Sequence, residues 1–169
     1  HASCEVEFSL EPERIMEVRR ILVGLDGSPR EQAVLATAQD LALRYEARLT
    51  LMRAVGLPPE IPPEAWQNPA VTVKEFLEGQ ARQGLEKLAR TLHKSLAQRY
   101  DLDVVIATPW QALCLGAQAL EADLIVIGSH GYGALDRVLG TTAARVVNHA
   151  LCSVLVVRAV PDGATPRHS

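Results

Sequence analysis

The sequence predicts a single α/β domain in which a parallel β-sheet is covered by helices on both faces. Five short aliphatic runs alternate with segments whose apolar residues recur at helical spacing. Three of these runs contain almost only Val, Ile and Leu, which is typical of strands buried on both sides. Parallel strands require long crossover connections, and the helical segments between the runs supply them. The 169 residues suffice for one such domain.

The aliphatic runs are the predicted strands. A buried helix would need a longer apolar run, and the first run ends at Asp26-Gly27, a pair typical of turns. The predicted strands are 21–25, 49–55, 104–107, 124–127 and 154–157.

Three of the four predicted helices begin at recognisable capping sequences. Residues 28–31 read Ser-Pro-Arg-Glu, which predicts a capping box with proline at the first helical position. In such a box the Ser28 hydroxyl accepts a hydrogen bond from a backbone N–H, and Glu31 reaches back. The segment 108–111, Thr-Pro-Trp-Gln, repeats the arrangement, and 72–75, Thr-Val-Lys-Glu, opens a longer helix.

The longest predicted helix carries an apolar stripe that marks a core face. This stripe continues from Leu77 to Leu96, so the helix is expected to include both residues. A last helix is predicted over about 142–150.

Two terminal segments and one loop lie outside the regular pattern. The domain is predicted to span 19–158, between an N-terminal extension, 1–18, and a C-terminal tail, 159–169. Neither end has strong periodicity, so both are expected to be frayed or loosely docked. The stretch 56–69 holds five of the ten prolines and is predicted to be a stiff surface loop.

Composition and charge exclude several classes of function. The formal net charge is 17 − 20 = −3 with no basic run, so no nucleic-acid partner is expected. No stretch approaches the roughly 18 apolar residues of a membrane span, and no signal-peptide pattern is present. Cys4, Cys114 and Cys152 form no C-x-x-C pair, which predicts neither a disulfide framework nor a zinc site. We therefore expect a cytoplasmic protein that binds neither nucleic acid nor membrane.

The long turn after the fourth predicted strand is a candidate site. In open α/β sheets, ligands bind beyond the carboxyl ends of the strands, where the winding direction reverses. The turn 128–142 holds four of the eleven glycines and ends at a predicted helix start beside Thr141 and Thr142. Glycines allow the backbone to approach a ligand closely, and a helix N-terminus suits phosphate. Composition alone leaves two interpretations open, a phosphate cradle and an ordinary flexible connection.

Other phosphate-binding and hydrolytic motifs are absent. No G-x-x-x-x-G-K-[ST] motif occurs, and the only three lysines lie on the predicted long helix. Gly131-x-Gly133 lacks the third glycine of a dinucleotide-binding motif and follows the fourth strand rather than the first. No G-x-S-x-G nucleophile elbow is present, which excludes an α/β-hydrolase.

Four segments together resemble a known family. They are 21–28 (Ile-Leu-Val-Gly-Leu-Asp-Gly-Ser), 123–131 (Asp-Leu-Ile-Val-Ile-Gly-Ser-His-Gly), 140–141 (Gly-Thr) and 153–158 (Ser-Val-Leu-Val-Val-Arg). In this combination they resemble the universal stress protein family over nearly all of 19–158. The nucleotide-binding branch of that family carries G-x2-G-x9-G-[ST]. In this chain Gly128-x2-Gly131 is followed by eight residues, rather than nine, before Gly140-Thr141.

The resemblance implies a five-stranded sheet of order 3-2-1-4-5, as in adenine nucleotide alpha hydrolase-like folds, with ATP bound between strands one and four. It implies that Asp26 contacts the adenosine, that the backbone at Arg53 lines the adenine and that residues 140–142 hold the phosphate tail. Mg²⁺ would bind through the phosphates. Arg53 stands where the family has a small aliphatic residue. The binding residues implied are Asp26, Arg53, Ile127, Gly128, Gly131, Gly140, Thr141 and Thr142.

The function expected from these features is ATP binding by a dimeric, nucleotide-gated stress-response module that is not an enzyme. The loop residues supply no nucleophile with a neighbouring base and no paired catalytic carboxylates. The resemblance implies a homodimer formed by antiparallel pairing of the last strand, 153–158. Two alternatives stay open: a weak ATP-hydrolysing or adenylate-forming enzyme, and a scaffold of the family that binds no nucleotide.

Overall fold

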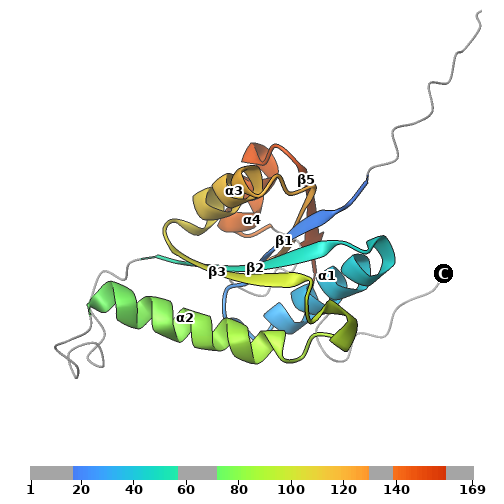
Figure 1. The fold of residues 1–169 in the computed structure, drawn as a ribbon. Coiled ribbons are helices and arrows are strands. Elements are labelled where there is room, and N and C mark those ends of the chain that lie inside the picture. Colours follow the sequence, from blue (N-terminus) through green and yellow to red (C-terminus); the bar gives the residue numbers. More distant parts are fainter. Residues whose placement is uncertain (1–16, 57–71, 130–138, 159–169) are drawn as a thin grey trace, which may run out of the picture.

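The computed structural model describes residues 17–56, 72–129 and 139–158, and it contains one sheet of five parallel strands (Figure 1). Their order, β3-β2-β1-β4-β5, confirms the order predicted from the sequence. The strands are β1 (Arg20–Gly24), β2 (Arg48–Val55), β3 (Tyr100–Ile106), β4 (Leu124–Gly128) and β5 (Ser153–Val157). The helices are α1 (Glu31–Tyr45), α2 (Val73–Ala89), α3 (Pro109–Ala119) and α4 (Thr141–His149), with a short 3₁₀ helix, η2, at Lys94–Leu96.

Helices cover both faces of the sheet, as predicted. Figure 1 shows α1 and α2 on one side and α3 and α4 on the other. Alternate residues of β1 therefore enter different cores: Ile21 and Val23 pack with the first pair of helices, and Leu22 packs with the second. Val18, which the sequence placed in the N-terminal extension, is 3% exposed and belongs to the first core.

The predicted helix starts are confirmed in part. At α2, Thr72 and Glu75 form the predicted capping box. At α3, Thr108 precedes a proline at the first helical position, but its side chain makes no capping hydrogen bond. At α1 the predicted box is confirmed only in part. The Ser28 Oγ accepts a hydrogen bond from the N–H of Arg30 at 3.3 Å, as expected, but the helix begins at Glu31, and the Glu31 carboxylate accepts from the N–H of Gly27 rather than that of Ser28.

Several element boundaries differ from the prediction, most of them by one residue. Helix α2 ends at Ala89, and Leu96 lies in η2, where it is fully buried. The apolar stripe extends past the helix because Leu96 enters the same core from a separate turn. Strand β3 begins at Tyr100 instead of residue 104, because an edge strand alternates polar and apolar residues and so lacks a continuous aliphatic run. Helix α4 begins one residue earlier than predicted.

Several expectations lie outside the described residues. These are the character of the loop 56–69 beyond Gly56, most of the extension 1–18, the tail 159–169, and Gly131. None of the helices in the described part of the chain is long and apolar enough to cross a membrane.

Candidate functional site

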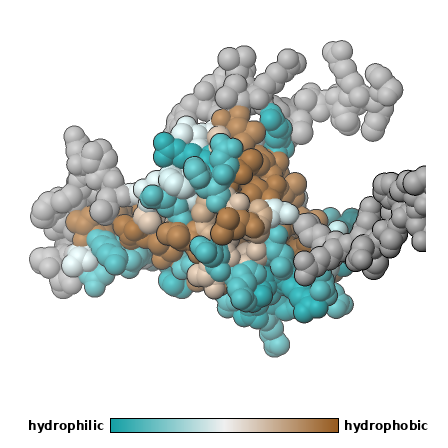
Figure 2. All heavy atoms as spheres, turned by 90° about the horizontal axis from the view of Figure 1, so that it is seen from above, coloured by the Kyte–Doolittle hydropathy of each residue, from teal (hydrophilic) through white to brown (hydrophobic). Residues whose placement is uncertain are grey.

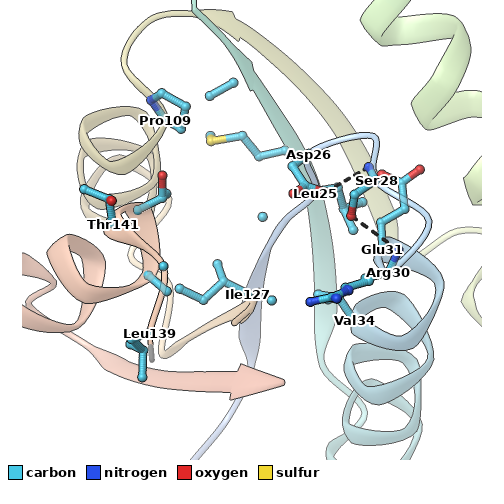
Figure 3. A pocket seen from close by; sticks show the side chains of 17 residues that line it. Leu25, Asp26, Ser28, Arg30, Glu31, Val34, Pro109, Ile127, Leu139 and Thr141 are labelled. Atoms are coloured by element: carbon cyan, nitrogen blue, oxygen red, sulfur yellow. Dashed lines mark hydrogen bonds between the residues drawn. The ribbon is translucent and has the colours of Figure 1, made fainter. Parts of the chain in front are cut away.

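A cavity of about 540 Å³ opens at the carboxyl ends of β1 and β4 (Figure 3). The sheet order reverses here, because the chain passes from β1 outward to β2 and β3 and then returns to the other side of β1 with β4. Such a switch point separates the loops that follow the two neighbouring strands and leaves a crevice between them. The cavity is lined by Gly24, Leu25, Asp26, Ser28, Arg30, Glu31, Val34, Met52, Ala54, Pro109, Ile127, Gly128, Leu139, Gly140, Thr141, Thr142 and Ala143.

The structure brings six of the eight predicted binding residues together around this cavity. They are Asp26, Ile127, Gly128, Gly140, Thr141 and Thr142. Gly131 lies outside the described residues. Arg53 is not among the lining residues, whereas its neighbours Met52 and Ala54 are. Successive side chains of a strand point to opposite faces, so the Arg53 side chain lies on the α1 and α2 side of β2.

The turn after β1 holds Asp26 at the edge of the cavity. The Asp26 Oδ1 accepts a hydrogen bond of 3.0 Å from the N–H of Ser28, an Asx turn that fixes the carboxylate relative to the backbone. Gly27 has φ of +80°, a conformation that glycine adopts without strain. The N–H of Leu25 donates to the Met52 carbonyl at 2.9 Å, which holds the end of β1 against β2. The Asp26 carboxylate is therefore positioned before any ligand arrives.

The floor of the cavity requires a glycine in β1. A Cβ on Gly24 would lie 2.8 Å from a side-chain carbon of Ile127 and 2.9 Å from one of Leu113, well inside van der Waals contact. Beside Gly24, the apolar side chains of Ile127 and Met52 line the inner surface of the cavity. A flat apolar ring would fit this surface.

The opposite wall is the N-terminus of α4. Gly140 occupies the N-cap position with φ −61° and ψ 156°, so its glycine is not required by backbone conformation, and it offers no side chain to cap the helix. The first backbone N–H groups of a helix lack intrahelical acceptors, and the helix dipole is positive at this end. Together with the hydroxyls of Thr141 and Thr142, this wall suits an anion such as phosphate.

Three charged side chains line the described part of the cavity, and one of them is a cation. Glu31 is neutralised by Arg53, whose Nη2 lies 2.5 Å from Glu31 Oε2. Figure 3 shows the Arg30 side chain extending from the start of α1 toward the cavity. From the sequence alone, Arg30 and Glu31 are predicted only to belong to the helix start. The signal that could have found them is their position in the first turn after the strand that carries Asp26.

Metal binding and thiol chemistry find no support in the described residues. Within 17–56, 72–129 and 139–158, no cluster of three or more His, Cys, Asp or Glu side chains is placed to hold a metal ion. Cys114 and Cys152 are free and partly buried against the core beneath α3 and α4, and burial raises the pKa of both thiols. Both pack as small hydrophobic residues against this core.

Comparison with solved structures supports the fold. A universal stress protein UspA from Lactobacillus plantarum superposes with a TM-score of 0.62 at 30% identity, covering 84% of this chain and 99% of that one. A universal stress protein in complex with cAMP gives a TM-score of 0.59 at 22% identity and 84% and 98% coverage. One from Archaeoglobus fulgidus in complex with dAMP gives 0.54 at 16% identity and 83% and 98% coverage.

Sequence comparison identifies the family. Universal stress protein A homolog 1 of Coxiella burnetii is 31% identical over 143 residues, which make up 84% of this chain and 97% of the relative. The model of the universal stress protein family matches residues 17–158, a span that contains all five strands and the whole described cavity. The chain belongs to the universal stress protein family.

Proposed function

We propose that the cavity between β1 and β4 binds an adenine nucleotide, ATP foremost, and that this binding gates a stress-response function. The observation that carries the proposal is the pairing of two unlike walls: a fixed carboxylate, Asp26, on one side and a helix N-terminus with two hydroxyls on the other. A nucleoside offers hydrogen-bond donors to a carboxylate, and its phosphates accept from N–H and O–H groups. The solved neighbours that hold cAMP and dAMP add support from the same fold.

The size and polarity of the cavity fit a nucleotide. A volume of about 540 Å³ lies within the range of roughly 300–1,000 Å³ typical of small-molecule sites. In the proposed complex the adenine rests on the apolar surface of Met52, Ala54 and Ile127, and Asp26 accepts hydrogen bonds from the adenosine. Gly128 and Gly131 lie against the ribose and phosphates, and residues 140–142 bind the phosphate tail. Mg²⁺ binds through the phosphates, since few cationic side chains lie nearby in the described part of the chain.

The proposed role is binding without efficient turnover, by a cytoplasmic homodimer. Strand β5 is the last strand of the sheet and pairs with β4 on its inner side. Leu151, two residues before β5, is 85% exposed, and Val147 of α4 is 48% exposed. Figure 2, which looks onto the α3 and α4 side, shows exposed apolar surface on this side of the molecule. Edge strands flanked by exposed apolar side chains suit pairing with a second copy.

The nucleotide proposal is tested by identifying what the purified protein carries and binds. Mass spectrometry of nucleotide released from freshly purified, denatured protein is expected to find ATP, and isothermal titration is expected to show tighter binding of ATP than of GTP. Bound ADP or AMP, with ATP consumed over time, would favour the enzyme instead. A chain that neither carries nor binds any adenine nucleotide would be the scaffold, and the proposal would fail.

The dimer is tested separately through an exposed side chain. Leu151→Asp places a charge on a residue that is 85% exposed, so the fold should persist. Light scattering is expected to show the dimer mass for the parent and the monomer mass for the variant. An unchanged dimer mass would place the interface elsewhere.

A further inference from the structure

One ion pair next to the site differs from all others in the described part of the chain. Arg53 of β2 and Glu31 of α1 are 12% and 16% exposed, and the atoms Nη2 and Oε2 lie 2.5 Å apart. In every other ion pair of that part, both side chains are at least 38% exposed. Exposed pairs contribute little to stability, whereas an enclosed charge needs its partner.

The Arg53 guanidinium lies between two glycines from different elements. A Cβ built on Gly84, in the middle of α2, would overlap Nη1 of Arg53. A Cβ on Gly27, in the turn after β1, would lie 3.7 Å from Cζ. Glycine weakens a helix interior, so its presence at position 84 is explained by the space that the guanidinium occupies.

Glu31 connects this guanidinium to the turn that carries Asp26. The same oxygen, Oε2, that contacts Arg53 also accepts a hydrogen bond of 2.9 Å from the N–H of Gly27. The residue before Gly27 is Asp26, whose carboxylate lines the cavity. Contacts thus lead in series from Arg53 through Glu31 and Gly27 to Asp26.

Stability alone does not account for this pair. Arg53 Nε is buried and has no hydrogen-bond acceptor among the described residues, so the guanidinium is incompletely satisfied. A pair of apolar side chains of the same size would often be as stable or more stable. What an apolar pair would not supply is an acceptor that fixes the N–H of Gly27.

We propose that Arg53 is a positioning residue of the nucleotide site: it holds the Glu31 carboxylate against Gly27 and thereby fixes the turn that presents Asp26. The inference rests on the proposed function, since it assigns a role in ligand binding to a residue that does not line the cavity. It also makes α2 part of the site's support, because the guanidinium packs against Gly84.

The test compares two arginine–carboxylate pairs on the same strand. Arg53→Met removes the positioning contact, and Arg48→Met is the matched control, since Arg48 pairs with Asp101 at 2.7 Å at the far end of β2 with side chains 52% and 55% exposed. Isothermal titration with ATP is expected to show a Kd about tenfold or more weaker for Arg53→Met, about threefold for Arg53→Lys, and unchanged within about twofold for Arg48→Met. Parental affinity in Arg53→Met would overturn the positioning role and leave the proposed function intact.

A second variant separates positioning from folding. Gly84→Ala removes no polar group but displaces the guanidinium, so it should weaken ATP binding in the parent and have no effect in the Arg53→Met background. All titrations are made well below the melting temperatures measured by circular dichroism, so that only folded protein is compared. An equal effect of Gly84→Ala in both backgrounds would show that α2, rather than the guanidinium, is responsible, and would contradict the proposal.

A readout without ligand tests the contact series itself. Hydrogen exchange followed by NMR is expected to show faster exchange at the Gly27 amide in Arg53→Met than in the parent. In the control Arg48→Met the Gly27 amide should exchange as in the parent. If the parent binds no adenine nucleotide, the proposed function fails, and this exchange measurement still decides whether Arg53 fixes the turn. Parental protection of Gly27 in Arg53→Met would overturn it.

Discussion

Helices α2 and α4 begin in opposite ways. At α2 the Thr72 Oγ1 accepts from the N–H of Glu75 at 3.2 Å, and the Glu75 carboxylate accepts from the N–H of Thr72 at 2.8 Å. At α4 the N-cap is Gly140, which has no side chain to offer. The first start satisfies two of its own backbone donors, whereas the second faces the cavity with donors that a ligand is able to use. We propose that the capped start of α2 is structural and that the uncapped start of α4, which lines the cavity, binds the ligand.

The largest expected effect on ATP binding comes from giving α4 a side-chain cap of its own. Gly140→Asp places a carboxylate at the helix start, where it competes with phosphate for the same donors and repels it. ATP binding should weaken by more than about a hundredfold, equivalent to about 2.7 kcal/mol. Without ligand the melting temperature should stay the same or rise, because aspartate caps a helix at least as well as glycine.

The measurement is isothermal titration together with melting followed by circular dichroism. Gly79→Asp is the control for the added charge, since the space around Gly79 in α2 is open. ATP affinity equal to that of the parent in Gly140→Asp would mean that no phosphate reaches α4.

A smaller effect is expected from removing a hydroxyl at the same helix start. Thr141→Ala removes a hydrogen bond to a charged acceptor, worth about 1.5–3 kcal/mol, so ATP binding should weaken about ten- to a hundredfold. Thr141→Ser keeps the hydroxyl and should bind within a few-fold of the parent. Titration of both variants checks this, and equal losses in the two would implicate the methyl group instead.

At α2 the corresponding change should affect stability and leave binding alone. Thr72→Ala removes the N-cap oxygen and should lower the free energy of unfolding by about 1 kcal/mol. Urea denaturation measures this loss, and ATP titration at a temperature where the variant is folded should give the parental Kd. Weaker ATP binding in this variant would show that the two helix starts are not independent.

The smallest effect concerns pH. The Thr72 N–H and hydroxyl, which donate to the Glu75 carboxylate, lower the pKa of that group in the folded protein. A group whose pKa is lower in the folded state stabilises the fold above its unfolded pKa, and this contribution is lost as pH falls through the folded value. Glu75→Gln should therefore reduce the loss of stability below about pH 4.3, the ordinary glutamate value. Urea denaturation across pH 3–6 compares the variant with the parent, and identical pH profiles would contradict the assignment.

Much of the fold was predictable because its decisive signals are local. The aliphatic strands and the box at Thr72 and Glu75 depend on residues close together in the chain, and the structure confirms them. The box predicted at 28–31 forms only in part, because the Glu31 carboxylate contacts the N–H of Gly27 and Arg53 instead of Ser28. Arg53 lies 22 residues further along, and no local pattern reports such a contact. The prediction that the long helix includes Leu96 is wrong for a similar reason, since helical spacing of apolar residues does not show where a helix ends.

The glycines and hydroxyls of the candidate site were predictable from the sequence. The residues that line its inner surface or pack behind it were not. The turn after β4 is visible in sequence as a concentration of glycine. Met52 and Ala54 line the cavity because alternate residues of β2 face opposite sides of the sheet, and Arg53 between them faces α1 and α2. The sequence gives no reason for a glycine at position 84. The structure gives one, because the Arg53 guanidinium occupies the space of a Cβ there.

The central claim, that the phosphates of an adenine nucleotide bind at the start of α4, is tested most directly by amide NMR. ¹⁵N-labelled protein is titrated in parallel with ATP and with adenosine, and the backbone amides at 141–143, at Asp26 and at the start of α2 are followed. The account predicts that both ligands shift the Asp26 amide, that only ATP shifts 141–143, and that neither shifts 73–75. Unchanged amides at 141–143 under saturating ATP would contradict it.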